Sequence, residues 1–185
     1  MKNAASFAIN NFPKLIASLQ QMTSKAVFVG VPSETTNIRD DLPTGEPINN
    51  ATLAYIQQNG SPAKNIPDRP FMTIGMDNAK EDCNDQLKKA ASEQLGKKEN
   101  SSVIRGLKLA GQIAENKIKE AINSNIQPAL SEATLKARAR RGRKGAIQEL
   151  ANRAAGMEPG SDLARTLVDT GAMRNSIKYV IRDNK

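Results

Sequence analysis

Two short segments of the chain carry side chains whose types and spacing could do chemistry. The first, Asp169-Thr170-Gly171, is superficially similar to the Asp-Thr-Gly motif of aspartic peptidases, in which two carboxylates share a proton. Such an enzyme needs strands around the aspartate, whereas helix-forming residues follow this triplet. We therefore favour Asp169 as the N-cap of a short helix, because a carboxylate accepts hydrogen bonds from the free amides there.

The second segment is a basic run that contains six cations and no acid within nine residues, namely Lys136, Arg138, Arg140, Arg141, Arg143 and Lys144. It accounts for most of the net charge of +8, since the chain has 27 Lys and Arg against 19 acids. The run could contact DNA phosphates, dock on an acidic partner, or be a solvated helix end with a mobile arm. No aromatic residue lies near it to stack on single-stranded bases, and because charge runs alone carry little specificity we favour docking or the solvated arm over DNA.

The residue inventory excludes much other chemistry. The 185 residues include no His and one Cys, so His-dependent nucleophilic relays, imidazole ligands and thiolate zinc cages are impossible within one chain. We expect no enzymatic activity, no cofactor and no metal, and we expect Cys83 to be a small buried residue on a helix. No uncharged run approaches the length that spans a bilayer, so we expect a soluble protein made in a cytoplasm, without membrane contact.

Periodicity and turn signals predict the elements that position these segments. Helical spacing is expected over 4–23, over 51–58 with Asn50 as cap, from 77 to about 96, from 101 or 102 towards Pro128, from 131 to about 142, over 146–155 and over 170–174. Strands are expected over 26–31, 71–74 and 177–182. Residues 33–50 predict an exposed loop, and residues 141–164, rich in Gly and Pro, predict an inserted mobile arm.

The six aromatic residues lie at positions 7, 12, 28, 55, 71 and 179, so none falls in the middle of the chain. Since rings bury large areas and favour sheets, we expect the core to join the first 75 residues to the C-terminal segment, with the middle as a helical layer. The sequence thus predicts a single α+β domain over 1–185. Its small, mostly antiparallel sheet packs against long helices, with extended loops and an inserted arm.

Three stretches together resemble the neck and tail-completion proteins of long-tailed bacteriophages, whose fold is related to that of tail terminators. The stretches are 55–62 with 66–71 (YIQQNGSP and IPDRPF), 128–135 (PALSEATL) and 167–177 (LVDTGAMRNSI). The similarity extends from about Val27 to Arg182. Gln58 and Thr166 depart from it, since such proteins often carry an acid and a proline there, and the segment 141–164 is longer than expected.

The resemblance implies a structural virion protein that forms a homo-oligomeric ring, a hexamer, at the phage neck. This ring would complete the tail and join it to the head connector, with neck, connector and tail-tube or sheath proteins as partners. The chain would be located in the virion and, during assembly, in the host cytoplasm. The alternative is a basic DNA-binding protein of the phage packaging or replication machinery, with DNA contacts from the basic run.

The motif residues also have a physical interpretation of their own. Asn59-Gly60 tolerates positive φ and can end a helix in a sharp turn. Arg69 could form a bidentate contact with a carboxylate of a neighbouring subunit or of its own chain. The structural and interface residues predicted in this way are Asn59, Gly60, Pro67, Arg69, Pro70, Phe71, Asp169, Thr170, Gly171 and Arg174.

Overall fold

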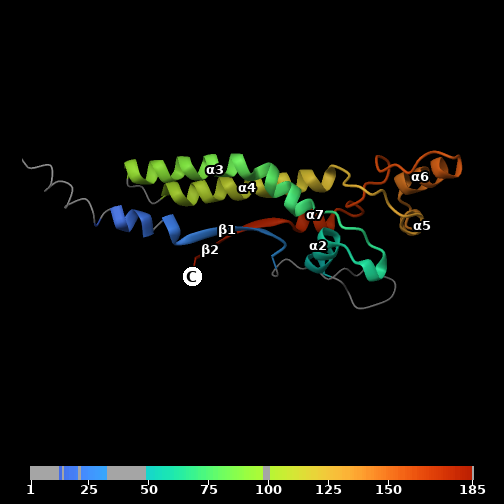
Figure 1. The fold of residues 1–185 in the computed structure, drawn as a ribbon, viewed down its shortest axis with the longest axis horizontal. Coiled ribbons are helices and arrows are strands. Elements are labelled where there is room, and N and C mark those ends of the chain that lie inside the picture. Colours follow the sequence, from blue (N-terminus) through green and yellow to red (C-terminus); the bar gives the residue numbers. More distant parts are fainter. Residues whose placement is uncertain (1–12, 14, 21, 33–48, 98–100, 185) are drawn as a thin grey trace, which may run out of the picture. The chain divides into compact units, whose positions relative to one another are not determined.

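The structure is a computed structural model that describes residues 13, 15–20, 22–32, 49–97 and 101–184. Its elements, in chain order, are β1 (Lys25–Gly30), α2 (Asn50–Asn59), the 3-10 turn η2 (Pro62–Lys64), α3 (Phe71–Lys97), α4 (Ser101–Asn123), α5 (Glu132–Arg140), α6 (Lys144–Ala154), α7 (Ala172–Ser176) and β2 (Lys178–Asp183). Figure 1 shows β1 and β2 as the two paired strands of one antiparallel sheet. The α+β class is confirmed, because the chain is rich in helix and has this small sheet.

Two predictions fall partly on residues outside this description. Of the helix expected over 4–23, residues 13, 15–20, 22 and 23 are described, and all are helical. Of the loop expected over 33–50, only Asn49 and Asn50 are described. Asn49, and not Asn50, is the N-cap of α2, since its side chain accepts a hydrogen bond from the Thr52 amide.

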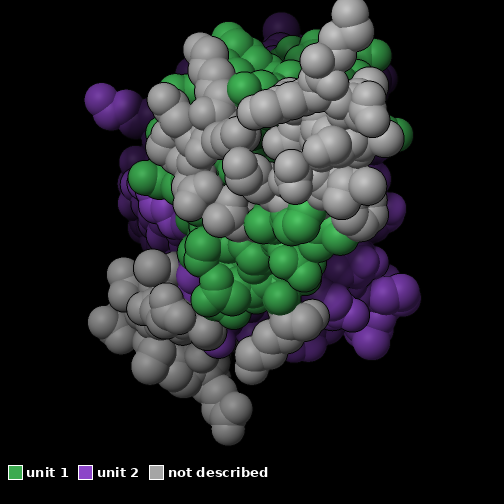
Figure 2. Space-filling view, turned by 90° about the vertical axis from the view of Figure 1, so that its left-hand side faces the viewer, with its two compact units in different colours: residues 1–29, 78–115, 179–185 green, residues 30–77, 116–178 purple. Residues whose placement is uncertain are grey.

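The chain divides into two compact units, coloured separately in Figure 2. Unit 1 consists of residues 1–29, 78–115 and 179–185, and unit 2 of residues 30–77 and 116–178. The prediction of one domain over 1–185 stays a prediction.

In unit 1 the strand ribbon packs on α4 through one ring. A Cβ atom on Gly111 would lie 2.6 Å from Tyr179 Cδ2, so only glycine allows this approach. The Tyr179 amide also donates to the Glu115 carboxylate at 3.0 Å. Among the described residues the expectation of an aromatic core holds only in part, because Phe71 is fully buried whereas Phe28 is 54% exposed and Tyr55 is 70% exposed.

Helix α4 supplies much of the buried apolar surface, through Leu107, Ala110, Ala114, Ile118, Ala121 and Ile122. In unit 1 it lies close to α3 at Gly106, where a Cβ atom would be 2.3 Å from that of Ala90. The Cys83 thiol of α3 donates to the Ala110 carbonyl at 3.3 Å. Cys83 is only partly buried, and this burial raises the pKa of its thiol.

In unit 2 the strand predicted over 71–74 was wrong, because these residues form the first turn of α3. Gln58 explains the difference. Its Oε1 accepts a hydrogen bond from the Met72 amide at 2.8 Å, which satisfies one of the free amides of a helix N-terminus. Pro70 precedes the helix, where no amide donor is required, and Phe71 is fully buried. A distant side chain therefore overrode the local strand propensity.

The helices α5 and α6 pack together around a small core of Leu130, Leu135, Ala146 and Ala164. The Ser131 hydroxyl accepts the Thr134 amide, so α5 is capped where the sequence predicted a helix to start. Helix α4 ends at Asn123, before the predicted stop at Pro128. Helix α6 lies within the segment predicted as a mobile arm, and its mobility stays a prediction.

Candidate interaction site

The Asn59-Gly60 turn ends α2 as predicted and sets the course of the chain towards Arg69. Gly60 has φ of +73°, and its amide donates to the Ile56 carbonyl at 2.8 Å. A Cβ atom there would lie 2.9 Å from backbone atoms of Ile66 and Asp68, so a glycine is required. Asn59 keeps helical backbone, and its side chain donates to the Tyr55 carbonyl at 3.0 Å. Pro67 is partly buried beside this turn.

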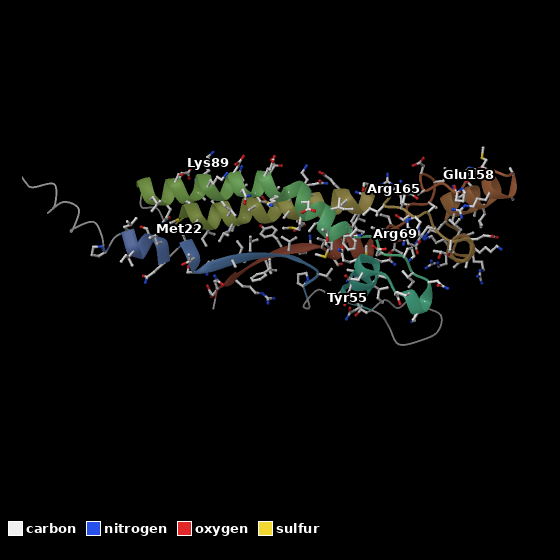
Figure 3. The ribbon with its side chains drawn as sticks, viewed as in Figure 1. Met22, Tyr55, Arg69, Lys89, Glu158 and Arg165 are labelled. Atoms are coloured by element: carbon white, nitrogen blue, oxygen red, sulfur yellow. The ribbon has the colours of Figure 1, made fainter. Side chains whose placement is uncertain are left out.

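Arg69 is a buried connector, with only 4% of its surface exposed (Figure 3). Its amide donates to the Gln57 carbonyl at 2.8 Å, and its Nη2 donates to the Pro128 carbonyl at 2.7 Å. The expected carboxylate partner is replaced by a carbonyl within the chain, and the buried Nε has no hydrogen-bond partner among the described residues. Burial lowers the pKa of Arg69. Arg69 therefore joins two segments that lie far apart in the sequence.

Arg138 of the basic run is buried rather than solvated. Its guanidinium donates to three backbone carbonyls, at 2.7 Å to Arg165, 3.2 Å to Thr166 and 3.1 Å to Val168. Burial lowers its pKa, and the neighbouring Asp169 opposes that shift. Arg138 thus fastens α5 to the segment before α7 by satisfying carbonyls that no regular element satisfies.

Asp169 is an ion-pair partner and not the predicted N-cap. Its Oδ2 lies 2.9 Å from Arg141 Nη2 and its Oδ1 lies 3.0 Å from Arg143 Nε. The N-cap position of α7 is Gly171, with φ of +82°, and the Thr170 hydroxyl accepts the Ala172 amide. Asp169 is thus paired with two guanidinium groups, whereas each aspartate of a peptidase dyad shares a proton with a second carboxylate.

The remaining predicted cations form no ion pair with Asp169 in the described part of the chain. Lys136 pairs with Glu132 at 2.6 Å on the exposed face of α5, and Arg140 donates to the Lys136 carbonyl. Arg174 of α7 donates to the Asn123 side chain at 3.4 Å. Lys144 is exposed at the start of α6.

Two cavities in unit 2 share Arg138 and Asp169 as lining residues, and we call them the paired cavities. The larger, about 270 Å³, is lined also by Arg143, Lys144, Asp162 and Arg165 together with backbone around Gly145 and Leu163. The smaller, about 190 Å³, is lined by Arg141 and by an apolar wall of Leu53, Leu167 and Met173. Five cations thus face two acids in the paired cavities, so they are suited to a negatively charged ligand.

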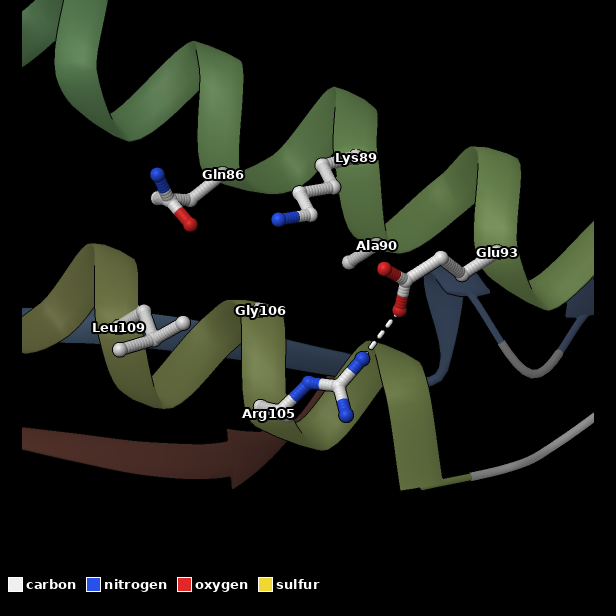
Figure 4. Close-up of a pocket in the computed structure, with 7 residues that line it drawn as sticks. All are labelled: Gln86, Lys89, Ala90, Glu93, Arg105, Gly106 and Leu109. Atoms are coloured by element: carbon white, nitrogen blue, oxygen red, sulfur yellow. Dashed lines mark hydrogen bonds and ion pairs between the residues drawn. The ribbon is translucent and has the colours of Figure 1, made fainter.

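A third cavity, of about 300 Å³, lies between α3 and α4 in unit 1. Figure 4 shows Glu93 of α3 and Arg105 of α4 pointing toward one another across it, joined by an ion pair. Gln86 and Lys89 also line it, while Gly106 and Ala90 form its floor where the helices come closest. Two of its charged groups, Glu93 and Arg105, therefore pair across the helix interface.

Neither metal-ligand clusters nor comparisons with other proteins indicate a function for the paired cavities. Within the described residues, no cluster of His, Cys, Asp and Glu could hold a metal ion, and none of the helices is both long and apolar enough to cross a bilayer. No family model matches the chain, and no characterised protein or solved structure was found to be similar to it.

Sequence reasoning missed one buried network, which is formed by Glu149 and Arg153 of α6. Glu149 is 3% exposed, and its Oε1 accepts from Arg153 Nε and from the Gly160 amide, both at 2.8 Å. Arg153 Nη1 also donates to the Leu130 carbonyl at 2.9 Å. The i,i+4 spacing of an acid and an arginine in the sequence was the available signal.

This network predicts an acid-sensitive contribution to stability. Burial alone would raise the pKa of Glu149, but the hydrogen bonds from Arg153 and Gly160 outweigh it, and the pKa is lowered. The contribution is therefore fully present above the ordinary glutamate pKa of about 4.3 and is lost as the pH falls through the lower folded-state value. We expect Glu149→Gln to be less stable than wild type at pH 7, with the difference shrinking below about pH 4.

Urea unfolding followed by circular dichroism between pH 3 and pH 7 measures this difference. The matched control is Glu158→Gln, since Glu158 is exposed in the turn after α6 (Figure 3), and it should follow the wild-type profile. A stability difference for Glu149→Gln that stays constant over this pH range would contradict the prediction.

Proposed function

We propose that this protein is a structural component of a long-tailed bacteriophage neck, where it forms a ring of identical subunits that completes the tail and joins it to the head connector. The observation that carries the proposal is the convergence of the three resembling stretches in unit 2. Arg69 of the first stretch donates to Pro128 of the second. Helix α2 packs on α7, which lies in the third stretch. The three stretches on which the resemblance rests are thus in contact with one another, as expected if they form the structural framework of such a protein.

The departure at Gln58 is compatible with this framework. Its side-chain oxygen accepts the Met72 amide at the start of α3 and its Nε2 donates to Thr73 Oγ1 at 3.0 Å. An acidic residue at the same place could accept the same amide, and a helix N-terminus favours a negative charge. Gln58 therefore preserves the capping role that an acid would have there.

The residue chemistry also supports a structural role over catalysis. The chain lacks His, and its most peptidase-like aspartate is held between Arg141 and Arg143. The DNA-binding alternative receives less support, because three cations of the basic run are engaged within the chain. Arg138 donates to backbone carbonyls, and Arg141 and Arg143 pair with Asp169. Each cation engaged in this way is less available to neutralise a phosphate.

Two measurements test the proposed function. Native mass spectrometry and negative-stain electron microscopy of the purified protein should show a closed ring with a single subunit number, six by the resemblance. Particles made without the protein should contain heads and tails that are unjoined or aberrant, and supplying the chain in trans should restore joining. Normal infectious particles in its absence would refute the proposal.

A further inference from the structure

We propose that the paired cavities of one subunit bind the acidic segment 33–48 of a second copy of the chain, so that charge joins consecutive subunits of the ring. This inference rests on the proposed function, because it names the contact from which such a ring would be built. The inference names the two surfaces that meet in the ring, a cationic receptor on one subunit and an acidic segment on the next subunit.

The receptor has more positive charge than its own acids can neutralise. Asp169 is already held by Arg141 and Arg143, and Asp162 is exposed at the rim. Lys144 and Arg165 line the larger cavity, are exposed, and form no ion pair with any described residue. Figure 3 labels Arg165 in the stretch of chain that follows α6. These two cations are available to an incoming carboxylate.

The backbone at the N-terminus of α6 also favours a negatively charged ligand. Lys144 is the first residue of this 11-residue helix, and no side chain caps its N-terminus. The partial positive charge of a helix N-terminus adds to that of the surrounding cations. Together with the exposed Lys144 and Arg165, which line the larger cavity, this makes a carboxylate group the favoured ligand.

The segment 33–48 has complementary composition. It contains four acids and one cation, namely Glu34, Asp40, Asp41, Glu46 and Arg39. Leu42 follows the two adjacent aspartates, and the smaller cavity offers an apolar wall of Leu53, Leu167 and Met173 beside its arginines. A segment with two carboxylates next to a leucine therefore matches the charged and apolar parts of the receptor.

A second copy is the occupant that fits a ring. Head-to-tail rings need two different surfaces on each subunit that complement one another, and the paired cavities and the segment 33–48 form such a pair. The segment ends at the N-cap of α2, whose Leu53 and Gln57 line the smaller cavity.

The experiment exchanges charges between the two surfaces. The receptor variant is Lys144→Glu/Arg165→Glu, and the segment variant is Asp40→Lys/Asp41→Lys. Each variant alone should raise the concentration at half assembly at least about tenfold, measured by mass photometry at low salt, because like charges then face one another. An equimolar mixture should assemble again into rings in which the two variants alternate, since every interface in such a ring pairs opposite charges.

Matched variants separate this contact from net charge. Lys64→Glu/Lys108→Glu changes two exposed lysines that line neither of the paired cavities, and Glu81→Lys/Asp82→Lys changes two exposed acids of α3. Both should assemble like wild type. Thermal unfolding verifies that each charge variant is folded, and Lys144→Ala/Arg165→Ala, which should weaken assembly less strongly, replaces the receptor variant if the glutamates prevent folding.

Three results would overturn the inference while leaving the proposed ring intact. The charge variants could assemble like wild type, the mixture of variants could fail to assemble, or the receptor variant could lose affinity for duplex DNA without any change in assembly. Docking of the segment on its own chain predicts the first of these results. A wild-type protein that stays monomeric would instead contradict both the proposed function and this inference.

Discussion

Replacement of Arg138 by methionine is expected to destabilise the protein by about 3–5 kcal/mol, because three backbone carbonyls lose their donor and each buried unpaired acceptor costs about 1–3 kcal/mol. The carbonyls of Arg165, Thr166 and Val168 depend on this one guanidinium. Methionine preserves most of the side-chain length and removes the donors. Urea unfolding at pH 7, followed by circular dichroism, measures the change in the free energy of unfolding.

The matched control for this prediction is Arg140→Met, two residues along the same helix. Arg140 is exposed and contacts only the Lys136 carbonyl, at a long 3.4 Å, among its described hydrogen bonds. We expect a change within about 0.5 kcal/mol, as is usual for exposed positions. Equal effects of the two substitutions would show that the basic run contributes through its total charge, and that the contacts of Arg138 are not specific.

Replacement of Gly75 by alanine is expected to destabilise the protein by about 1–2 kcal/mol net, because overpacking of so close a helix contact costs up to about 3 kcal/mol. A Cβ atom on Gly75 of α3 would lie 2.5 Å from Ile118 Cα and 2.8 Å from Ile118 N. These are backbone atoms of α4, so no side-chain rotation can relieve the overlap. The loss should exceed the gain of about 1 kcal/mol that alanine brings to a helix interior.

The same helix offers a control with the opposite sign. A Cβ atom on Gly96 of α3 would have no atom within 4 Å. Gly96→Ala should therefore stabilise the protein by up to about 1 kcal/mol through helix propensity alone. Thermal unfolding of both variants decides the prediction. A Gly75→Ala protein that melts at or above the wild-type temperature would mean that the helices can separate without cost at this contact.

Local sequence signals predicted most of the elements, because helix periodicity, caps and turn residues act over only a few positions. The helix α4, the start of α5 after Ser131 and the Gly60 turn were all identified in this way. The placement of the aromatic residues led us to expect that the N-terminal part of the chain joins the C-terminal segment, and strands from these two parts pair. The strand predicted at 71–74 failed because the amide of Met72 is satisfied by Gln58, fourteen positions earlier in the chain.

The candidate site shows the limit of the same reasoning. The sequence pointed to Arg69, Asp169 and the basic run, yet the contacts expected for Arg69 and for Asp169 differ from those observed. Arg69 bonds a carbonyl, and Asp169 pairs with two arginines of the run instead of capping a helix. The Glu149 network was missed entirely, although its acid and arginine are four residues apart.

By itself, then, the sequence determined the inventory of chemistry, the α+β class and the places where charge is concentrated. Residue types and short-range spacing suffice for these, since they reflect the preferences of each peptide segment. Only the tertiary structure decided which cations of the basic run are buried and which remain exposed. Arg138 and Arg140 lie on the same helix and cannot be distinguished by charge, and what separates them is a set of carbonyls about thirty residues later that folding brings against one side of α5.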